Sequence, residues 1–322
     1  MNWRDIAAER PKSDSCSVTV LIAAYNAAPF LHRAVGSALD QTLAPLEVLI
    51  VDDGSTDNTA EVAVDIGQRD PRVRLIRLQR NGGPAVARNA GLKVARGSWI
   101  AVLDADDAIV PERLERLVRA GSRFGADVVL DNFCWYDSRT DAIGPPGIPA
   151  SDAVDTVDRY EFVMRARPYT NQADWGLLQP MFRRGFLEQH RLTYPTSCRH
   201  GEDFLLMMDL LFAGAATILV RSPGYLYTTR NAGLSRTVVD YDTMAKMTAN
   251  LLRARQVSAD KRLKCLLRAR VNALRRLSAE RKLQSFASAH DYRKIGRGVL
   301  ADYWMARAVL GFGLRKVRSF LR

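Results

Sequence analysis

The stretch Val18-Thr-Val-Leu-Ile-Ala-Ala24 is a continuous apolar run, partly β-branched, and Tyr25-Asn26 follow it directly. Strands of a parallel sheet that are covered on both faces have unbroken apolar runs of this kind. Pro29 then begins a segment with apolar residues at helical spacing over 30–39. The stretch therefore predicts a central parallel strand that leads into a helix.

The same alternation continues along the chain. Further strands are predicted at 46–51, 73–78, 99–103 and 127–131, and helices at 57–68, 84–96 and 111–120. Short loops that join strands and helices in this order indicate an α/β fold with a mostly parallel sheet flanked by helices. Ligands of such sheets bind beyond the carboxyl ends of the strands. The polar residues Tyr25-Asn26, Asp52-Asp53 and Asp104 to Asp107 all fall at those ends.

Charge divides the chain into two parts. The net charge is +12, yet residues 1–250 have a net charge of −3, while residues 251–322 contain 19 Lys and Arg against 4 Asp and Glu. Helical patterns return at 158–166, 202–213 and 240–256, and 251–285 is helical in composition and rich in Arg. We predict a main domain at 1–250 and a basic helical extension at 251–322, each with its own partner.

The most specific local motif is Val102-Leu-Asp-Ala-Asp-Asp107. Three carboxylates at the end of a buried strand repel one another unless a positive charge lies among them. Mg²⁺ or Mn²⁺ solves this problem, because such an ion typically takes one or two carboxylates together with phosphate oxygens of a substrate. The alternative is a solvated acidic turn that caps the helix at 111–120.

Two further motifs carry glycines at turns. Gly54 permits a tight turn after Asp53, which could accept hydrogen bonds from a ribose or a base, although plain turn and capping chemistry is the alternative. Gly82-Gly83 precede a helix whose free N–H groups could face an anion. Arg88, one turn into that helix, could reach a nucleotide or hold the acidic loop. Neither G-x-G-x-x-G nor a P-loop is present, which disfavours a dinucleotide fold or an NTPase.

Glu202-Asp203 stand at the start of a strongly apolar helix. A carboxylate held there is rigidly placed to act as a general base. The alternative is an acidic first turn that stabilises the helix dipole. The four cysteines are far apart and form no C-x-x-C pair, which argues against a disulfide framework or a thiolate zinc site and favours a reducing compartment.

Taken together, these motifs resemble the family 2 glycosyltransferases, which adopt the GT-A fold. The matching segments follow in sequence order: Val18–Asn26, Val51–Thr59, Asn81–Leu92, Leu103–Asp107, Gly201–Asp203 and Tyr225–Arg236. The amino-acid sequences at 84–92 and 103–115 are similar to those of bacterial exopolysaccharide enzymes of the succinoglycan-assembling type. The resemblance implies an inverting transfer of a sugar from a nucleotide-sugar donor, a UDP-sugar, to a saccharide acceptor, with Mn²⁺ or Mg²⁺ as the cofactor.

The resemblance also implies roles for individual residues. A nucleotide-binding half at 15–131 would hold the donor through Ala23, Tyr25, Asn26, Asp53, Arg88 and Asp104. Asp104 and Asp106 would be the Asp-x-Asp pair, with Asp106 the direct metal ligand and Asp107 beside it. In the acceptor-side half at 132–250, Asp203 would be the base, with Glu202 as the competing candidate. Arg230 would close over the diphosphate, although its Tyr-x-Tyr-x-x-Arg spacing departs from that of many relatives.

Two other function classes stay open on the sequence. A sugar-phosphate nucleotidyltransferase has a similar sheet and metal need, but it usually carries a Gly-rich loop with Arg or Lys where this chain has Ala-Ala-Tyr-Asn. A non-catalytic protein that binds a membrane or nucleic acid through the basic extension is the other alternative. Nucleic-acid binding needs a recognisable reading module, and because none is visible we expect no nucleic-acid partner.

The basic extension mixes apolar groups with cations, as in Tyr303-Trp-Met-Ala-Arg-Ala-Val-Leu. Such a segment suits an anionic membrane surface; a helical bundle with solvated Arg is the alternative. The resembling exopolysaccharide enzymes act on lipid-linked acceptors, which membrane contact would bring within reach. The first residues contain no apolar signal segment, and the chain has no clean run of about 18 apolar residues. We therefore expect a cytoplasmic protein, peripheral at the inner face of the membrane.

Overall fold

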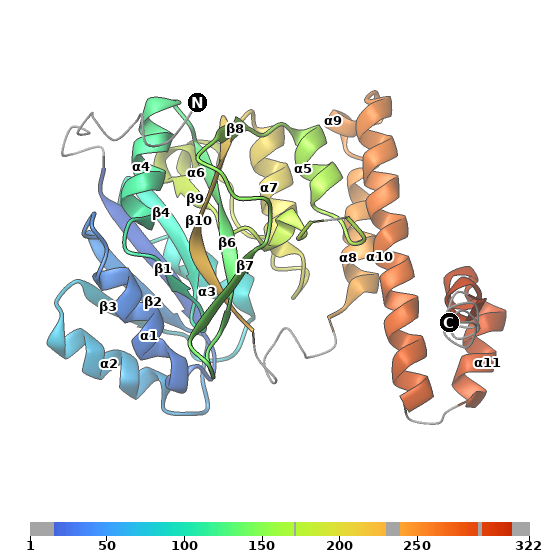
Figure 1. The fold of residues 1–322 in the computed structure, drawn as a ribbon, viewed down its shortest axis with the longest axis horizontal. Helices are drawn as coiled ribbons and strands as arrows, with labels where there is room; N and C mark the ends of the chain where they lie inside the picture. The colour runs from blue at the N-terminus through green and yellow to red at the C-terminus, as the bar shows by residue number, and fades with distance from the viewer. Residues whose placement is uncertain (1–15, 171, 230–238, 289–291, 311–322) are drawn as a thin grey trace. The chain divides into compact units, whose positions relative to one another are not determined.

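The computed structural model describes residues 16–170, 172–229, 239–288 and 292–310, which form two compact units (Figure 1). Unit 1 holds the described residues through Phe162 and those from 172 to 229. Unit 2 holds 163–170 and the described residues from 239 onward. The division predicted at residue 250 falls inside helix α8 (Tyr241–Leu251), and the domain assignment stays a prediction.

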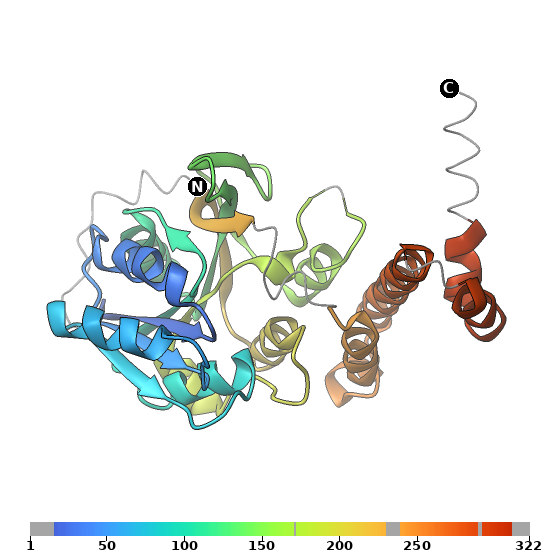
Figure 2. The ribbon, with the colours of Figure 1, turned by 90° about the horizontal axis from the view of Figure 1, so that it is seen from below.

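Unit 1 is built on one sheet. Its strands are β1 (Val18–Ala24), β2 (Glu47–Asp52), β3 (Val73–Arg77), β4 (Trp99–Asp104), β5 (Ala108–Ile109), β6 (Val128–Asp137), β7 (Ala142–Pro146), β8 (Val154–Thr156), β9 (Met181–Arg183) and β10 (Thr217–Thr229). The strand order is β3-β2-β1-β4-β9-β6-β10-β5, with β7 beside β6 and β8 beside β10. Helices flank the sheet, as Figures 1 and 2 show.

The sheet has a parallel core that the sequence predicted. β1 pairs in parallel with β2 and β4, β2 pairs with β3, and β6 pairs with β10. The short strand β9 lies antiparallel between β4 and β6. The prediction of an α/β sheet flanked by helices is confirmed, and its antiparallel members are the additions that the apolar pattern did not show.

The predicted helices are present with small shifts at their ends. Those of the sheet unit are α1 (Ala28–Leu39), α2 (Thr59–Arg69), α3 (Pro84–Leu92), α4 (Arg113–Arg123), α6 (Arg184–His190) and α7 (Glu202–Phe212), with the 3-10 helix η3 (Trp175–Leu177); α5 (Arg159–Arg165) spans the two units. In α1, Pro29 lies in the first turn, and Leu31, Val35 and Ala38 are buried. This spacing is the amphipathic pattern read from the sequence.

The register brings the candidate residues to one edge of the sheet. Ala23 of β1 is paired with Val51 on one side and with Asp104 on the other. The carboxyl ends of β1, β2 and β4 therefore meet, as expected for neighbouring parallel strands. Deeper in unit 1, Arg113 and Asp131 form a fully buried ion pair of 2.8 Å that ties α4 to β6.

Unit 2 contains α8, α9 (Arg255–Ser258), α10 (Lys261–Ser288) and α11 (Tyr292–Ala301). Ala245 of α8 packs against Val271 and Leu274 of α10 in a small apolar core. Among the residues that the structure describes, no helix is both long enough and apolar enough to cross a bilayer.

Candidate active site at the carboxyl ends of the strands

Asp104, the last residue of β4, is held from two sides. One carboxylate oxygen accepts a hydrogen bond of 2.9 Å from Arg88 Nη2, and the other accepts one of 2.8 Å from Gln179 Nε2. Its backbone N–H donates to Tyr225 Oη at 3.1 Å. Asp104 is therefore fixed by residues from α3, the loop before β9, and β10.

Asp107 points into the protein rather than toward solvent. It is 2% exposed, and its carboxylate accepts hydrogen bonds from Tyr225 Oη at 2.7 Å and from the Thr228 backbone N–H at 2.8 Å. Burial raises the pKa of Asp107 to about 7, and the nearby charge of Asp104 adds to the effect. This carboxylate anchors the acidic turn to β10.

Asp106 lies between them and is partly exposed. Its backbone carbonyl accepts a hydrogen bond from Arg33 of α1, whose guanidinium also donates to Thr228 Oγ1 at 2.6 Å. The acidic turn is thus clamped to α1 and β10 through Arg33.

Arg88 joins the acidic turn to the start of α7. Its side chain is 5% exposed and forms ion pairs with Asp104 at 2.9 Å, Asp203 at 3.0 Å and Glu202 at 3.1 Å. The guanidinium also lies 5.2 Å from the centre of the Tyr194 ring. One buried cation with three carboxylates leaves an excess of negative charge. Such a cluster favours retention of a proton.

The two α7 carboxylates differ in access. The side chain of Asp203 is 26% exposed, whereas that of Glu202 is 6% exposed. Burial, reinforced by the charge of Asp203, raises the pKa of Glu202 to about 7. Burial also raises the pKa of Asp203, against the attraction of Arg88. Asp203 therefore presents a basic carboxylate to solvent, and Glu202 lies behind it.

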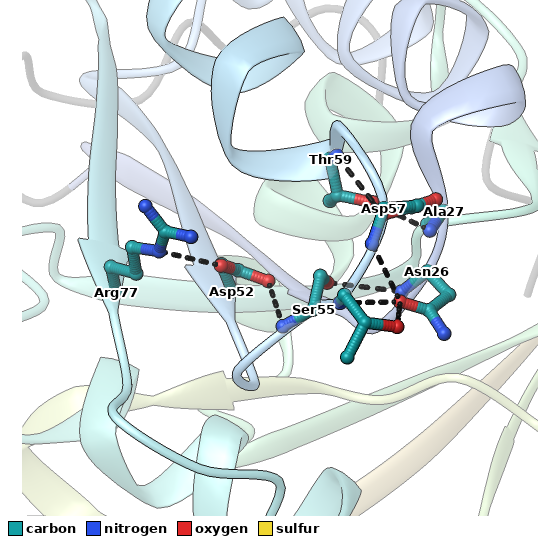
Figure 3. Close-up of polar contacts among 8 residues, drawn as sticks. Asn26, Ala27, Asp52, Ser55, Asp57, Thr59 and Arg77 are labelled. Carbon is teal, nitrogen blue, oxygen red and sulfur yellow. Dashed lines mark hydrogen bonds and ion pairs between the residues drawn. The ribbon is translucent and has the colours of Figure 1, made fainter.

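Figure 3 shows how the loop after β1 is tied to the loop after β2. Asn26 has a φ of 49°, and its side-chain oxygen accepts hydrogen bonds from the backbone N–H of Thr56 at 2.9 Å and of Asp57 at 3.4 Å. Its own backbone N–H donates to Ser55 Oγ at 3.0 Å. Asn tolerates this left-handed backbone better than most residues do. Asn26 therefore fixes the loop that leaves Tyr25, 38% exposed, at the surface.

Asp53 holds the glycine turn in front of α3. Its two carboxylate oxygens accept hydrogen bonds from the backbone N–H of Gly82 at 2.9 Å and of Gly83 at 2.8 Å. Burial raises the pKa of Asp53, although these two donors oppose the rise. The N–H groups that the sequence offered to an outside anion thus bind a carboxylate of the protein itself.

The structure brings most of the predicted residues together. Asp104, Arg88, Glu202 and Asp203 form one hydrogen-bonded cluster, and Asp106 and Asp107 lie on the adjoining turn. Ala23, Tyr25, Asn26 and Asp53 lie at or just after the ends of the two neighbouring strands β1 and β2. Arg230 lies outside the described residues.

Sequence reasoning missed Gln179, Tyr194 and Thr228 as members of the site. Gln179 bonds Asp104, Tyr194 packs on Arg88, and Thr228 bonds both Asp107 and Arg33. No local pattern marks Gln179, because its partner lies 75 positions earlier in the chain. The Tyr225–Arg236 segment offered a signal, since Thr228 belongs to it.

Within the described part of the chain, no three His, Cys, Asp or Glu side chains are grouped so that they could hold a metal ion among themselves. Asp104 and Asp107 use their oxygens for internal hydrogen bonds. The arrangement fits a cation held by Asp106 with phosphate oxygens of a substrate, which is the usual way in which Mg²⁺ binds.

A family described as Glycosyl transferase family 2 matches residues 19–211. The chain is 37% identical over 219 residues to the succinoglycan biosynthesis protein ExoO of Rhizobium meliloti (strain 1021), covering 68% of this chain and 62% of ExoO. It is 34% identical over 249 residues to ExoU of the same organism, covering 76% of this chain and 71% of ExoU.

Among solved structures, S. aureus TarS 1-349 in complex with UDP-GlcNAc is similar with a TM-score of 0.62 and 23% identity, over 78% of this chain and 71% of that one. This likeness shows a shared fold, and the extended sequence matches show common membership. The chain belongs to glycosyl transferase family 2.

Proposed function

We propose that this protein is an inverting glycosyltransferase that transfers a sugar from a UDP-sugar to a saccharide acceptor in the synthesis of a cell-surface or exported polysaccharide. The observation that carries the proposal is the Arg88 cluster, which holds the strand-end Asp104 and the helix-start Asp203 around one guanidinium. In this proposal the donor binds beside Asp104, and Asp203 is the base. The family match does not favour a nucleotidyltransferase or a non-catalytic binding protein.

The donor and the polysaccharide are inferred from the relatives. TarS has been solved with UDP-GlcNAc, and ExoO and ExoU are named for succinoglycan biosynthesis. A UDP-sugar donor and a saccharide acceptor follow from these names by analogy. In this proposal Ala23, Tyr25 and Asp53 lie on the nucleoside side of the site.

Asp203 is the proposed base. It removes the proton of the acceptor hydroxyl as the oxygen attacks the anomeric carbon from the face opposite the diphosphate, which inverts the configuration. The choice over Glu202 rests on access, since a base must come within hydrogen-bond distance of the proton it removes. The raised pKa of Asp203 makes it a stronger base than an ordinary carboxylate.

Asn in place of Asp203 tests this assignment. The Asp203→Asn variant should lose transfer by about 10²–10⁴-fold, the usual contribution of a general base, while its affinity for UDP-sugar, measured by calorimetry, stays near that of the wild type. Asp209→Asn, on the same helix, is the matched control. A wild-type transfer rate in Asp203→Asn would exclude Asp203 as the base, and loss of activity in Glu202→Gln alone would move the role to Glu202.

Asp106 is the proposed ligand of Mn²⁺ or Mg²⁺. A bound cation would neutralise charge that develops on the departing diphosphate. Asp106→Ala should lower the affinity for UDP in the presence of Mn²⁺ by about tenfold or more, and should leave the weaker metal-free affinity unchanged. Calorimetric titrations with and without Mn²⁺ measure both, with Asp65→Ala on α2 as the control. If the affinity for UDP depends equally on Mn²⁺ in the wild type, Asp106→Ala and Asp65→Ala, Asp106 is not a metal ligand.

The basic extension at 251–322, most of which belongs to unit 2, is proposed to hold the enzyme at the inner face of the membrane, near a lipid-linked acceptor. Residues 251–322 contain 19 Lys and Arg against 4 Asp and Glu. Basic segments of this density are attracted to anionic lipid headgroups.

A further inference from the structure

Two aromatic side chains lie side by side on β6 and β10. Trp135 and Tyr227 are directly paired in the parallel register, and their ring centres are 5.3 Å apart at an angle of 72°. Both are partly exposed, while Phe133, 1% exposed, lies 5.0 Å from Trp135 and 5.5 Å from Tyr227. Phe133 therefore supports two rings that retain accessible surface.

The pair points to the face of the sheet away from α1. Tyr136 and Thr228, the next residues on each strand, are also paired with each other, and both contact Arg33 of α1. Successive side chains of a strand point to opposite faces. Trp135 and Tyr227 therefore share the opposite face with Tyr225, whose hydroxyl contacts Asp104 and Asp107.

This face carries the chemistry proposed above. Tyr225 and Tyr227 have ring centres 6.5 Å apart, and two residues of a strand span about 7 Å. Tyr225 contacts the acidic turn. The distance from Tyr225 to the Trp135–Tyr227 pair is therefore about the length of one sugar ring. Burial raises the pKa of Tyr227, and the charges of Asp104, Asp107 and Asp203 add to the rise.

Two glycines of the adjoining segment lie close to Phe133 and to Trp135. A Cβ at Gly147 would lie 2.3 Å from Phe133 Cζ, so only glycine permits the observed position of the supporting ring. A Cβ at Gly144 of β7 would lie 3.3 Å from the Trp135 carbonyl oxygen and 3.4 Å from Trp135 Cβ, which is a tight contact.

We propose that Trp135 and Tyr227 form a platform that binds a pyranose ring of the acceptor saccharide beside Asp203. This inference rests on the proposed glycosyltransferase function and adds a binding subsite to it. The C–H face of a pyranose is apolar and slightly positive, so it packs on the electron-rich face of an aromatic ring. The Tyr227 hydroxyl supplies a polar group that can bond a sugar hydroxyl, as small-ligand sites combine apolar walls with a few polar groups.

Fluorine NMR of the full chain labelled with 5-fluorotryptophan tests this binding. The probes are methyl β-D-glucopyranoside, methyl β-D-galactopyranoside, cellobiose and lactose, added in the presence of UDP and Mn²⁺. The Trp135 resonance, assigned from its loss in Trp135→Phe, should shift on titration, whereas those of the buried Trp99 and of Trp304 in unit 2 should not. A Trp135 resonance that no probe moves would overturn the proposal.

Kinetics of variants separate this inference from the proposed function. Trp135→Ala should raise the KM for acceptor, or weaken probe binding, by about tenfold, with UDP-sugar affinity unchanged; Trp135→Phe should restore most of the loss. Tyr303→Ala, which removes an exposed ring of unit 2, is the control. Loss of UDP-sugar affinity in Trp135→Ala would assign the platform to the donor and overturn the acceptor assignment. Failure of the wild type to bind any UDP-sugar would instead count against the proposed function.

Discussion

Glu202 shows how a single buried carboxyl group links the site to stability. Its side chain is 6% exposed and shares Arg88 with Asp203 and Asp104. Its pKa is about 7 in the folded protein against an ordinary value of 4.5. Between these two values the folded protein binds a proton that the unfolded chain has lost, so the free energy of unfolding falls as the pH rises through this window.

Glu202→Gln should remove that dependence. The variant cannot ionise, so relative to the wild type it should gain about 1–3 kcal/mol in the free energy of unfolding between about pH 5 and about pH 8. Urea titrations at the two pH values measure the change. Glu188→Gln, at an exposed position of α6, should show no comparable gain. A difference between Glu202→Gln and wild type that is the same at both pH values would mean that Glu202 ionises normally.

The acidic turn shows what could be predicted at the scale of residues. The motif Asp104 to Asp107 correctly marked the end of β4, because an apolar strand followed by polar residues is a local pattern. The pattern did not separate the three carboxylates. Asp104 is bonded by Gln179, and Asp107 by Tyr225, which lies 118 positions away. Partners at such separations are set by the sheet order and leave no trace in the local sequence.

The sequence left two roles possible for Arg88: it could contact a nucleotide or hold the acidic loop. In the structure it contacts the acidic loop through Asp104 and also reaches α7. The second contact depends on where α7 docks, which helical periodicity alone does not determine. The Gly82-Gly83 turn was likewise predicted to face an anion, and the anion in the structure is the Asp53 carboxylate of the protein itself.

At the scale of elements, strands with two buried faces were the easiest to predict. β1, β2 and β4 are covered by other elements on both sides, and their unbroken apolar runs place them within one residue of the predicted bounds. β6 was predicted to end at 131 but continues to Asp137, where its pattern includes the polar Asn132 and the partly exposed Trp135. This extension carries Trp135, one of the two residues proposed to bind sugar.

Short strands and irregular pairings could not be predicted. β5 has 2 residues and β9 has 3, too few to show a period. β10 runs for 13 residues through Pro223 and Gly224, with register shifts against β6 on either side of Pro223. Pro and Gly within an apolar run ordinarily indicate the end of a strand. The register shifts that accommodate them are properties of the pairing with β6.

At the scale of the whole chain, the uneven charge leads to a prediction about membranes. Arg268 and Arg275 are exposed on α10 and lie seven residues apart, on one face of the helix. The full chain should bind vesicles of phosphatidylglycerol more tightly than vesicles of phosphatidylcholine, and added salt should weaken the binding. Sedimentation with vesicles measures both effects.

Reversing charge at these two positions tests whether unit 2 makes the contact. Arg268→Glu with Arg275→Glu should lower affinity for phosphatidylglycerol vesicles by about tenfold or more, since each basic residue near an anionic surface contributes about 1 kcal/mol. Arg69→Glu with Lys93→Glu makes the same change in net charge on exposed positions of unit 1. An equal loss in both double variants would mean that attraction follows net charge alone, and no loss in either would mean that the basic unit does not bind the membrane.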